Sequence, residues 1–375
     1  MSERERAILV CLEIGRATPF DRAEEATSLT QSAGADVACV IAGRRDRPDA
    51  ATYAGSGNVE EIRLAAREHR AGAVVFDHAL TAVQIRNLER ALSDAGSPIR
   101  VFDRTDLILE IFAQRARSHE GKLQVELARL EHLSTRLVRG WTHLERQRGG
   151  LSKTGGPGEK QIELDRRLIG ERVKKLKERL RKVARTRATQ RAARARSGVL
   201  RVSIVGYTNA GKSTLFNRLT RAGAYVADKL FATLDPTTRR VHLADGVAAA
   251  LSDTVGFVRD LPHGLVAAFR ATLEETVQAD LLLHVVDASS SCREEQIEAV
   301  NAVLAEIGAA DIPQIVVWNK IDRIAGAVPE AVCDSCGNIL NIKASAVSGA
   351  GVEIIRLALS EVARQAGSRA LASAA

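Results

Sequence analysis

The octet from Gly206 to Ser213, with the spacing G-x-x-x-x-G-K-S, is the segment that most constrains what this chain can fold into. It follows the apolar run from Val202 to Val205 and precedes Thr214, Leu215 and Phe216, an order typical of strand, loop and helix. In such a loop the glycines let backbone N–H groups face a phosphate, and the helix start adds its positive dipole end. The alternative is a glycine-rich surface turn. The flanking strand and helix favour the phosphate loop.

Two further segments match the chemistry of a nucleotide and its metal ion. Lys212 would reach the β- and γ-phosphates, and the Ser213 hydroxyl would ligate Mg²⁺. The Pro-containing loop from Phe231 to Thr237 is placed like a mobile switch, in which Thr233 would complete the Mg²⁺ shell only when a γ-phosphate is present. After the strand that ends at Leu251, Asp253 can hold Mg²⁺ through water and the Gly256 N–H can sense the γ-phosphate.

The segment Asn319-Lys320-Ile321-Asp322 predicts a preference for guanine. A carboxylate at Asp322 can accept both N1–H and N2–H₂ of guanine, whereas adenine offers neither donor there, and an unpaired carboxylate is penalised. The strand that ends near Ser345 supplies backbone for the guanine O6. The sequence therefore predicts a GTP-binding domain. The residues expected to contact GTP are Gly206, Tyr207, Thr208, Asn209, Ala210, Gly211, Lys212, Ser213, Thr214, Phe231, Ala232, Thr233, Leu234, Asp235, Asp253, Thr254, Val255, Gly256, Asn319, Lys320, Ile321, Asp322, Ser345, Ala346 and Val347.

A basic segment precedes this domain. Residues 121–196 contain 22 Lys and Arg against 8 Asp and Glu, although the whole chain has a net charge of only +8. Residues 105–148 are predicted as one helix, and a second apolar stripe from Ile162 to Val183 predicts an antiparallel helical hairpin. Its tip, 149–160, is rich in glycine. The charge indicates a polyanion partner, either RNA or an anionic lipid surface, or else a solvated helix pair with a floppy turn.

Insertion of the tip into structured RNA would use flexible backbone and cationic side chains, because phosphates and shape are read more than sequence. The expected RNA contacts are Gly150, Lys153, Gly155, Gly156, Gly158, Lys160, Arg166 and Arg167.

Residues up to about Asp103 alternate short β-branched runs with amphipathic stretches, which predicts a small parallel α/β domain. Its Gly55-Ser56-Gly57 segment is either an anion-binding helix start or, as we favour, a turn. The expected α/β architecture is thus a GTPase domain with a mostly parallel sheet and helices on both faces, preceded by this small domain and the hairpin. We assign 1–115 to the N-terminal domain, 116–197 to the hairpin and linker, 198–365 to the GTPase domain and 366–375 to a disordered tail.

No apolar run approaches the roughly 20 residues of a membrane-spanning helix, and the start has no signal-peptide apolar region, so we expect a cytoplasmic chain without stable membrane insertion. The five cysteines include one C-x-x-C pair, Cys333 and Cys336. Because a zinc site needs four ligands and no second pair accompanies this one, a plain loop is favoured over a structural or redox role.

The order of these motifs resembles the translation-factor class of GTPases, and the whole chain resembles the HflX family. The most specific strings lie outside the generic motifs: Asp103 to Thr105, Ile111 to Ala116, Glu120 to Leu127, and Gly155 to Glu159 through Asp165 to Arg167. The resemblance implies a GTPase that binds the large ribosomal subunit and its ribosomal RNA, with the hairpin reaching toward the peptidyl-transferase centre to help split stalled ribosomes under stress. It also implies that Ser213 and Thr233 ligate Mg²⁺.

Two departures qualify the resemblance. Many family members carry an additional C-terminal domain, whereas this chain ends in small residues from Ala370 to Ala375, so we expect the contacts of that domain to be missing here. The tip has Lys160 and Leu164 where polar residues are common in the family.

The residue after Gly256 is Phe257, where many GTPases place a water-orienting glutamine. A phenyl ring cannot orient water by hydrogen bonding, so no catalytic side chain is assigned and hydrolysis of GTP to GDP is expected to be slow alone and faster with the ribosome. By resemblance to cation-dependent GTPases, Asn209 is either a K⁺ ligand or a residue of loop geometry.

Two other functions compete with ribosome splitting. One is a GTP-switched RNA-binding scaffold in ribosome assembly or hibernation, and the other is a GTPase that acts on tRNA or at membranes. The sequence argues against the second function, because it contains neither a membrane-anchoring motif nor the catalytic Cys/His set expected of an RNA-modifying enzyme. We expect a monomer.

Overall fold

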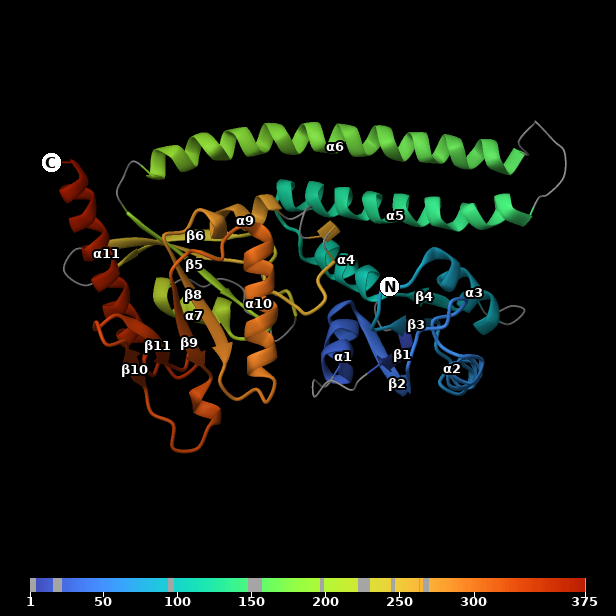
Figure 1. Cartoon of the computed structure of the whole chain (residues 1–375), viewed down its shortest axis with the longest axis horizontal. Coiled ribbons are helices and arrows are strands. Elements are labelled where there is room, and N and C mark those ends of the chain that lie inside the picture. Colours follow the sequence, from blue (N-terminus) through green and yellow to red (C-terminus); the bar gives the residue numbers. More distant parts are fainter. Residues whose placement is uncertain are drawn as a thin grey trace. The chain divides into compact units, whose positions relative to one another are not determined.

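The computed structural model describes residues 5–15, 22–93, 98–147, 157–195, 199–221, 230–243, 247–262, 264–265 and 270–374 (Figure 1). They form two compact units. Unit 1 comprises Met1–Gln114 and Lys122–Leu180, and unit 2 comprises Arg115–Gly121 and Arg181–Ala375. The expected separate hairpin domain, 116–197, is therefore divided between the two units. Most of the hairpin, Lys122–Leu180, belongs to unit 1, while its two ends belong to unit 2.

Unit 1 contains a parallel four-stranded sheet of order β2-β1-β3-β4, which confirms the predicted small α/β domain. Its strands are β1 (Glu5–Ile14), β2 (Ala35–Arg45), β3 (Ala73–Phe76) and β4 (Arg100–Phe102), and its helices are α1 (Arg22–Ser32), α2 (Ser56–Glu68), α3 (Ala82–Leu92) and α4 (Arg104–Arg115). β1 is buried continuously from Ala7 to Leu12, because parallel strands are covered on both faces. Thr81 and Gln84 form a capping box that fixes the start of α3.

The long helices are α5 (His119–Gln147) and α6 (Pro157–Ala195). Leu123 and Leu127 of α5 pack on Leu176 of α6, with Val173 and Leu180 at the margin, so the predicted stripes do meet as an antiparallel pair. The single helix expected over 105–148 is wrong, since the chain leaves the helix after Arg115 and resumes it at His119. The reason is that the N–H groups of Arg117 and Ser118 bond a carboxylate outside the helix.

Unit 2 contains a seven-stranded sheet of order β10-β11-β9-β8-β5-β7-β6, in which only the edge pairings β10 with β11 and β6 with β7 are antiparallel among the described strands. Its strands are β5 (Leu200–Gly206), β6 (Thr237–His242), β7 (Ala248–Asp253), β8 (Leu281–Asp287), β9 (Gln314–Asn319), β10 (Glu330–Cys333) and β11 (Ile339–Lys343), and its helices are α7 (Lys212–Thr220), α9 (Arg270–Val277), α10 (Arg293–Ile307) and α11 (Val352–Ala374), with a 3₁₀ turn, η2, at Ile321–Arg323. The parallel strands carry their following loops to one edge, which is where ligands bind in such sheets.

The core of unit 2 lies between the sheet and helices α7 and α11, with Phe216 and Leu359 fully buried against Ile204 and Leu283. Helices α9 and α10 contact β5. The tail expected to be disordered from residue 366 instead continues α11 to Ala374, as alanine, the best helix former, allows. Cys333 is the last residue of β10 and Cys336 lies in the turn that follows. Both are exposed, and β10 and β11 form an antiparallel hairpin that was not predicted. Within the described part of the chain, no helix is both long and apolar enough to cross a membrane.

Candidate nucleotide site

The phosphate loop is shaped by glycine at both ends. Gly206 ends β5 with φ +147°, and a Cβ there would lie 2.2 Å from the Val285 carbonyl oxygen, so no other residue fits. Gly211 has φ +95° and comes directly before α7, which begins at Lys212. This bend places the first turn of α7 at the wall of a cavity of about 330 Å³.

Lys212 is almost completely buried, and its Nζ donates a hydrogen bond to the Tyr207 carbonyl oxygen at 2.6 Å. Burial lowers the pKa of this ammonium to about 8, with Lys320 adding to the shift and the Asp253 carboxylate opposing it. A cation held in this way at the floor of the cavity can receive an anionic group.

Three side-chain oxygens converge beside Lys212. The hydroxyls of Ser213 and Thr233 both donate to Asp253 Oδ2, at 2.7 Å and 2.9 Å, and the two hydroxyl oxygens are 2.8 Å apart. Burial raises the pKa of Asp253, although both hydroxyls and Lys212 oppose that shift. Hydroxyl and carboxylate oxygens are the donor set that Mg²⁺ prefers, so these residues fit the ion that GTPases generally use.

The segment after β7 is hydrogen-bonded to the phosphate loop. Thr208 N–H donates to the Phe257 carbonyl at 2.7 Å, and Phe257 N–H donates to the Gly206 carbonyl at 3.2 Å. The Phe257 side chain is buried and does not line the cavity. At Gly256 a Cβ would come within 2.7 Å of Thr208 Cγ2, so glycine allows this close backbone approach.

At the other end of the cavity, one amide joins three loops. Asn319 Nδ2 donates to the Ala210 carbonyl at 2.8 Å, and Asn319 Oδ1 accepts from Ala346 N–H at 2.9 Å. The Asp322 carboxylate accepts from Ser345 Oγ at 2.5 Å and lines the cavity. This arrangement presents a fixed acceptor, as recognition of N1–H and N2–H₂ requires.

The structure brings most of the predicted contact residues to the cavity wall. Those that line it are Thr208, Asn209, Gly211, Lys212, Ser213, Thr214, Phe231, Ala232, Thr233, Thr254, Gly256, Asn319, Lys320, Asp322, Ala346 and Val347. The others lie behind it or beside it, namely Gly206, Tyr207, Ala210, Leu234, Asp235, Asp253, Val255, Ile321 and Ser345. Arg323 also lines the cavity and was missed, although its place directly after Asp322 is a signal that could have found it.

Two supporting residues were also missed. Arg218 of α7 donates from Nε to the Ala346 carbonyl at 3.1 Å and from Nη2 to the Val347 carbonyl. Asp287, at the end of β8, accepts from Lys320 Nζ at 2.7 Å, and its pKa is lowered, because hydrogen bonds from Lys320 and Ser289 outweigh burial. The partners of Arg218 lie far from it in the chain, so no local sequence pattern could have predicted these hydrogen bonds.

Of the predicted RNA-contacting residues, Gly150, Lys153, Gly155 and Gly156 lie outside the described residues. Gly158 and Lys160 belong to the first turns of α6. Arg166 and Arg167 follow in the same helix with exposed side chains. The expected cationic surface is therefore described only at these two arginines.

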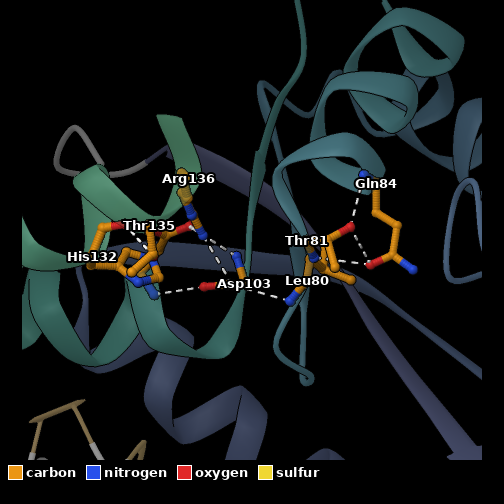
Figure 2. A network of polar contacts seen from close by, with 8 residues as sticks. Leu80, Thr81, Gln84, Asp103, His132, Thr135 and Arg136 are labelled. Carbon is orange, nitrogen blue, oxygen red and sulfur yellow. Dashed lines mark hydrogen bonds and ion pairs between the residues drawn. The ribbon is translucent and has the colours of Figure 1, made fainter. Parts of the chain in front are cut away.

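A second polar cluster lies in unit 1, where Asp103, Asp106 and His132 have the spacing of metal ligands. Arg136 fills this position instead, with Nη2 2.9 Å from Asp103 Oδ2 and 2.7 Å from Asp106 Oδ2. Figure 2 shows Asp103 between Arg136 of α5 and Leu80, whose N–H it accepts at 3.1 Å. Because a guanidinium already neutralises the carboxylates, the cluster is an ion-pair network that ties α4 to α5.

The fold and the cavity together define a P-loop GTPase, with a phosphate loop, a set of Mg²⁺-type oxygen ligands and a guanine-type acceptor at one edge of a parallel sheet. Three family models match the chain: "GTP-binding GTPase N-terminal" over residues 21–113, "GTP-binding GTPase Middle Region" over 115–194 and "50S ribosome-binding GTPase" over 201–320. The chain belongs to the HflX family of GTPases, and it is a GTP-binding, GTP-hydrolysing enzyme.

Several known proteins resemble it over nearly its full length. The GTPase HflX of Escherichia coli K12 is 52% identical over 357 residues, which cover 95% of this chain and 82% of that protein. The GTPase HflX of Magnetococcus marinus is 52% identical over 346 residues, covering 92% and 77%. Among solved structures, the crystal structure of an SsGBP and GDP complex has a TM-score of 0.51 at 24% identity and covers 96% of this chain and 99% of its own, which supports the fold.

Proposed function

We propose that this GTPase binds the large ribosomal subunit and its ribosomal RNA and, with GTP, separates the subunits of stalled ribosomes under stress. The observation that carries the proposal is the basic antiparallel pair α5 and α6, whose two ends lie in the same compact unit as the GTP cavity. A long cationic lever that begins at a nucleotide switch is suited to reach into structured RNA. The "50S ribosome-binding GTPase" family model over residues 201–320 supports the same partner.

In this proposal Ser213 and Thr233 ligate Mg²⁺ directly and Asp253 acts through water, while Lys212 binds the β- and γ-phosphates. Asp322 recognises guanine. The convergence of the three oxygens within hydrogen-bond distance supports the metal assignment. Bound Mg²⁺ would supply charge neutralisation on the transferred phosphoryl group.

Hydrolysis should be slow without the ribosome, because Phe257 stands where many GTPases place a water-orienting glutamine, and its buried phenyl ring cannot orient water by hydrogen bonding. The ribosome would accelerate hydrolysis, either by ordering the switch loops or by supplying a catalytic group. We also propose that Asn209, which has φ +60° and lines the cavity, contributes to a K⁺ site. Equal turnover in KCl and NaCl at the same ionic strength would remove K⁺ from the proposal.

The test is sedimentation of intact ribosomes with the protein and a non-hydrolysable GTP analogue. We expect separated subunits with the wild-type chain, and intact ribosomes with a chain that lacks residues 150–158. Co-sedimentation with unsplit ribosomes or with assembly precursors would favour the alternative, a GTP-switched RNA-binding scaffold.

A charge-matched pair of variants separates a specific RNA contact from a general electrostatic effect. Arg166→Glu with Arg167→Glu changes exposed side chains of α6, and Arg44→Glu with Arg90→Glu makes the same charge change at exposed positions of the N-terminal domain. Binding to the large subunit should fall strongly only in the first variant. An equal loss in both would leave only non-specific attraction.

A further inference from the structure

Asp235 is a predicted GTP-contacting residue that the structure places outside the cavity wall. It lies two residues after Thr233 and directly before Pro236 and β6. Its carboxylate is engaged by the chain segment that precedes α5, which belongs to the same compact unit as the nucleotide cavity. The contact therefore joins the switch loop to the base of the hairpin.

The carboxylate of Asp235 accepts three hydrogen bonds from this segment. Its Oδ2 accepts from the backbone N–H groups of Arg117 and Ser118, both at 2.8 Å, and its Oδ1 accepts from the Ser118 hydroxyl at 2.5 Å. Hydrogen bonds to an ionised acceptor are about twice as strong as neutral ones, so this is a firm anchor for a loop residue.

The geometry is that of a capping box completed by a remote residue. Ser118 is the N-cap of α5, and its Oγ accepts from the N–H of Gly121, the third residue of the helix, at 2.8 Å. In a capping box the side chain at that third position returns to bond the N–H of the N-cap residue. Here the third residue is glycine and has no side chain. Asp235 takes the Ser118 N–H instead.

Gly121 is what makes room for this arrangement. A Cβ added to Gly121 would lie 2.3 Å from Asp235 Oδ1 and 3.1 Å from Ser118 Oγ. Any other residue at this position would push the Asp235 carboxylate away from the helix. The helix start and the switch loop are thus mutually fitted.

We propose that Asp235 is a positioning residue of the GTPase site: it acts through Thr233, and its anchor is the first turn of the hairpin helix. Thr233 is bonded to Asp253 and Ser213 at one side of the loop, and Asp235 is bonded to Arg117 and Ser118 at the other. Between them, Leu234 is 2% exposed. The loop is thus held by hydrogen bonds on both sides of Leu234. The inference rests on the proposed role of Thr233 in Mg²⁺ binding and not on the ribosomal activity.

The anchor has a specific energetic signature. Ordering one loop residue costs about 1–2 kcal/mol, which corresponds to a factor of about 5 to 30 in affinity. Because Thr233 contributes only when a γ-phosphate is present, loss of the anchor should weaken binding of GTP and leave binding of GDP unchanged. By linkage, GTP should protect the first turn of α5 to the same extent.

The sharpest test is Gly121→Ala, which displaces the carboxylate from a position outside the cavity wall. Alanine is the better helix former, so weaker helix formation cannot explain a loss. The matched control is Gly170→Ala in α6, where an added Cβ meets nothing within 4 Å. Affinities for fluorescent GDP and for a fluorescent non-hydrolysable GTP analogue are measured with Mg²⁺. For Gly121→Ala we expect about a tenfold loss for the analogue and no change for GDP, whereas Gly170→Ala should match the wild type.

Asp235→Ala should give the same selective loss, and the double variant Asp235→Ala with Gly121→Ala should be no worse than either single one, because both remove one contact. Asp235→Asn should show an intermediate loss of affinity for the analogue, because the carbonyl oxygen of asparagine can still accept hydrogen bonds. Wild-type affinities in Gly121→Ala and Asp235→Ala, or equal losses for GDP and the analogue, would overturn the inference. Thr233→Ala separates the two proposals. If Thr233→Ala binds the analogue like the wild type, both the anchor and the proposed role of Thr233 in Mg²⁺ binding fail. If it alone shows the selective loss, only the anchor fails.

Discussion

The ammonium of Lys212 donates a hydrogen bond of 2.6 Å to the carbonyl oxygen of Tyr207 while its side chain is almost fully buried. Burial lowers the pKa of Lys212 from its ordinary value of 10.5 to about 8. At neutral pH the folded protein therefore carries this charge at a cost of about 3 kcal/mol relative to water. The phosphates of a nucleotide would remove much of this cost by neutralising the ammonium. The same residue thus opposes folding and favours ligand binding.

The first prediction is that Lys212→Met stabilises the protein when no nucleotide is present. The substitution keeps the volume of the side chain and removes the buried charge, so the melting temperature of the nucleotide-free protein should rise by several degrees. Binding of GDP should be lost, because the phosphates lose their cation. Lys174→Met, at an exposed position of α6, is the control and should change neither quantity. A lower melting temperature for Lys212→Met would contradict the assignment of a costly buried charge.

The second prediction concerns pH. The pKa of Lys212 is lower in the folded protein than in the unfolded chain, so unfolding takes up a proton between about pH 8 and pH 10.5. The contribution of Lys212 to the free energy of unfolding should therefore increase as pH rises through this window. Denaturant titrations of the wild type and of Lys212→Met at several pH values isolate this term. The stability advantage of Lys212→Met should shrink from pH 8 to pH 10.5, and an advantage that does not change with pH would count against the shift.

The third prediction is that Arg218 holds the loop that contacts guanine. Its guanidinium bonds the carbonyls of Ala346 and Val347, and Val347, 68% exposed, lines the cavity. Because that loop would contact the base in both nucleotides, Arg218→Ala should weaken GDP and the GTP analogue equally, by about tenfold, as expected for losing charge-assisted hydrogen bonds. Arg218→Lys should be intermediate. Arg293→Ala, at an exposed position of α10, is the control, and a loss confined to the analogue would refute the role.

These residues also show how far the sequence could be interpreted. The phosphate loop and the Asn319 to Asp322 segment were predictable, because each is a local string whose residue types follow from phosphate and guanine chemistry. Arg218 was not, since its partner Ala346 lies 128 positions away. The break in the predicted helix at 116–118 was missed for the same reason. The carboxylate that competes for the Ser118 N–H is 117 positions away, at Asp235. Helical periodicity alone cannot predict a hydrogen-bond acceptor so far away in the chain.

The fourth prediction is that the cluster of Asp103, Asp106 and His132 is held by Arg136 and needs no metal ion. Burial and the nearby Asp106 carboxylate raise the pKa of Asp103, with Arg136 opposing that shift. Arg136→Met would leave two largely buried carboxylates without their cation and should lower the free energy of unfolding by about 3 kcal/mol. A chelator should leave the melting temperature of the wild type unchanged.

Arg129 provides the control for this network. It pairs with Glu110 at 2.6 Å on the surface of α5, where ion pairs contribute little, so Arg129→Met should cost less than about 1 kcal/mol. If a chelator lowers the melting temperature of the wild type, the cluster is a metal site after all.

The last prediction tests the base itself. Asp322 accepts a hydrogen bond from Ser345 Oγ at 2.5 Å and turns its carboxylate edge to the cavity. In Asp322→Asn one oxygen becomes an NH₂ group that faces the N1–H or N2–H₂ donors of guanine, so affinity for GDP should fall at least about 100-fold. Xanthine carries an oxygen in place of the guanine amino group and accepts from that NH₂, so xanthosine diphosphate should bind the variant better than it binds the wild type. Asp322→Ala should lose guanine without gaining xanthine. Retention of GDP affinity within a few-fold in Asp322→Asn would mean that guanine is recognised elsewhere in the cavity, with Arg323 the next residue to change.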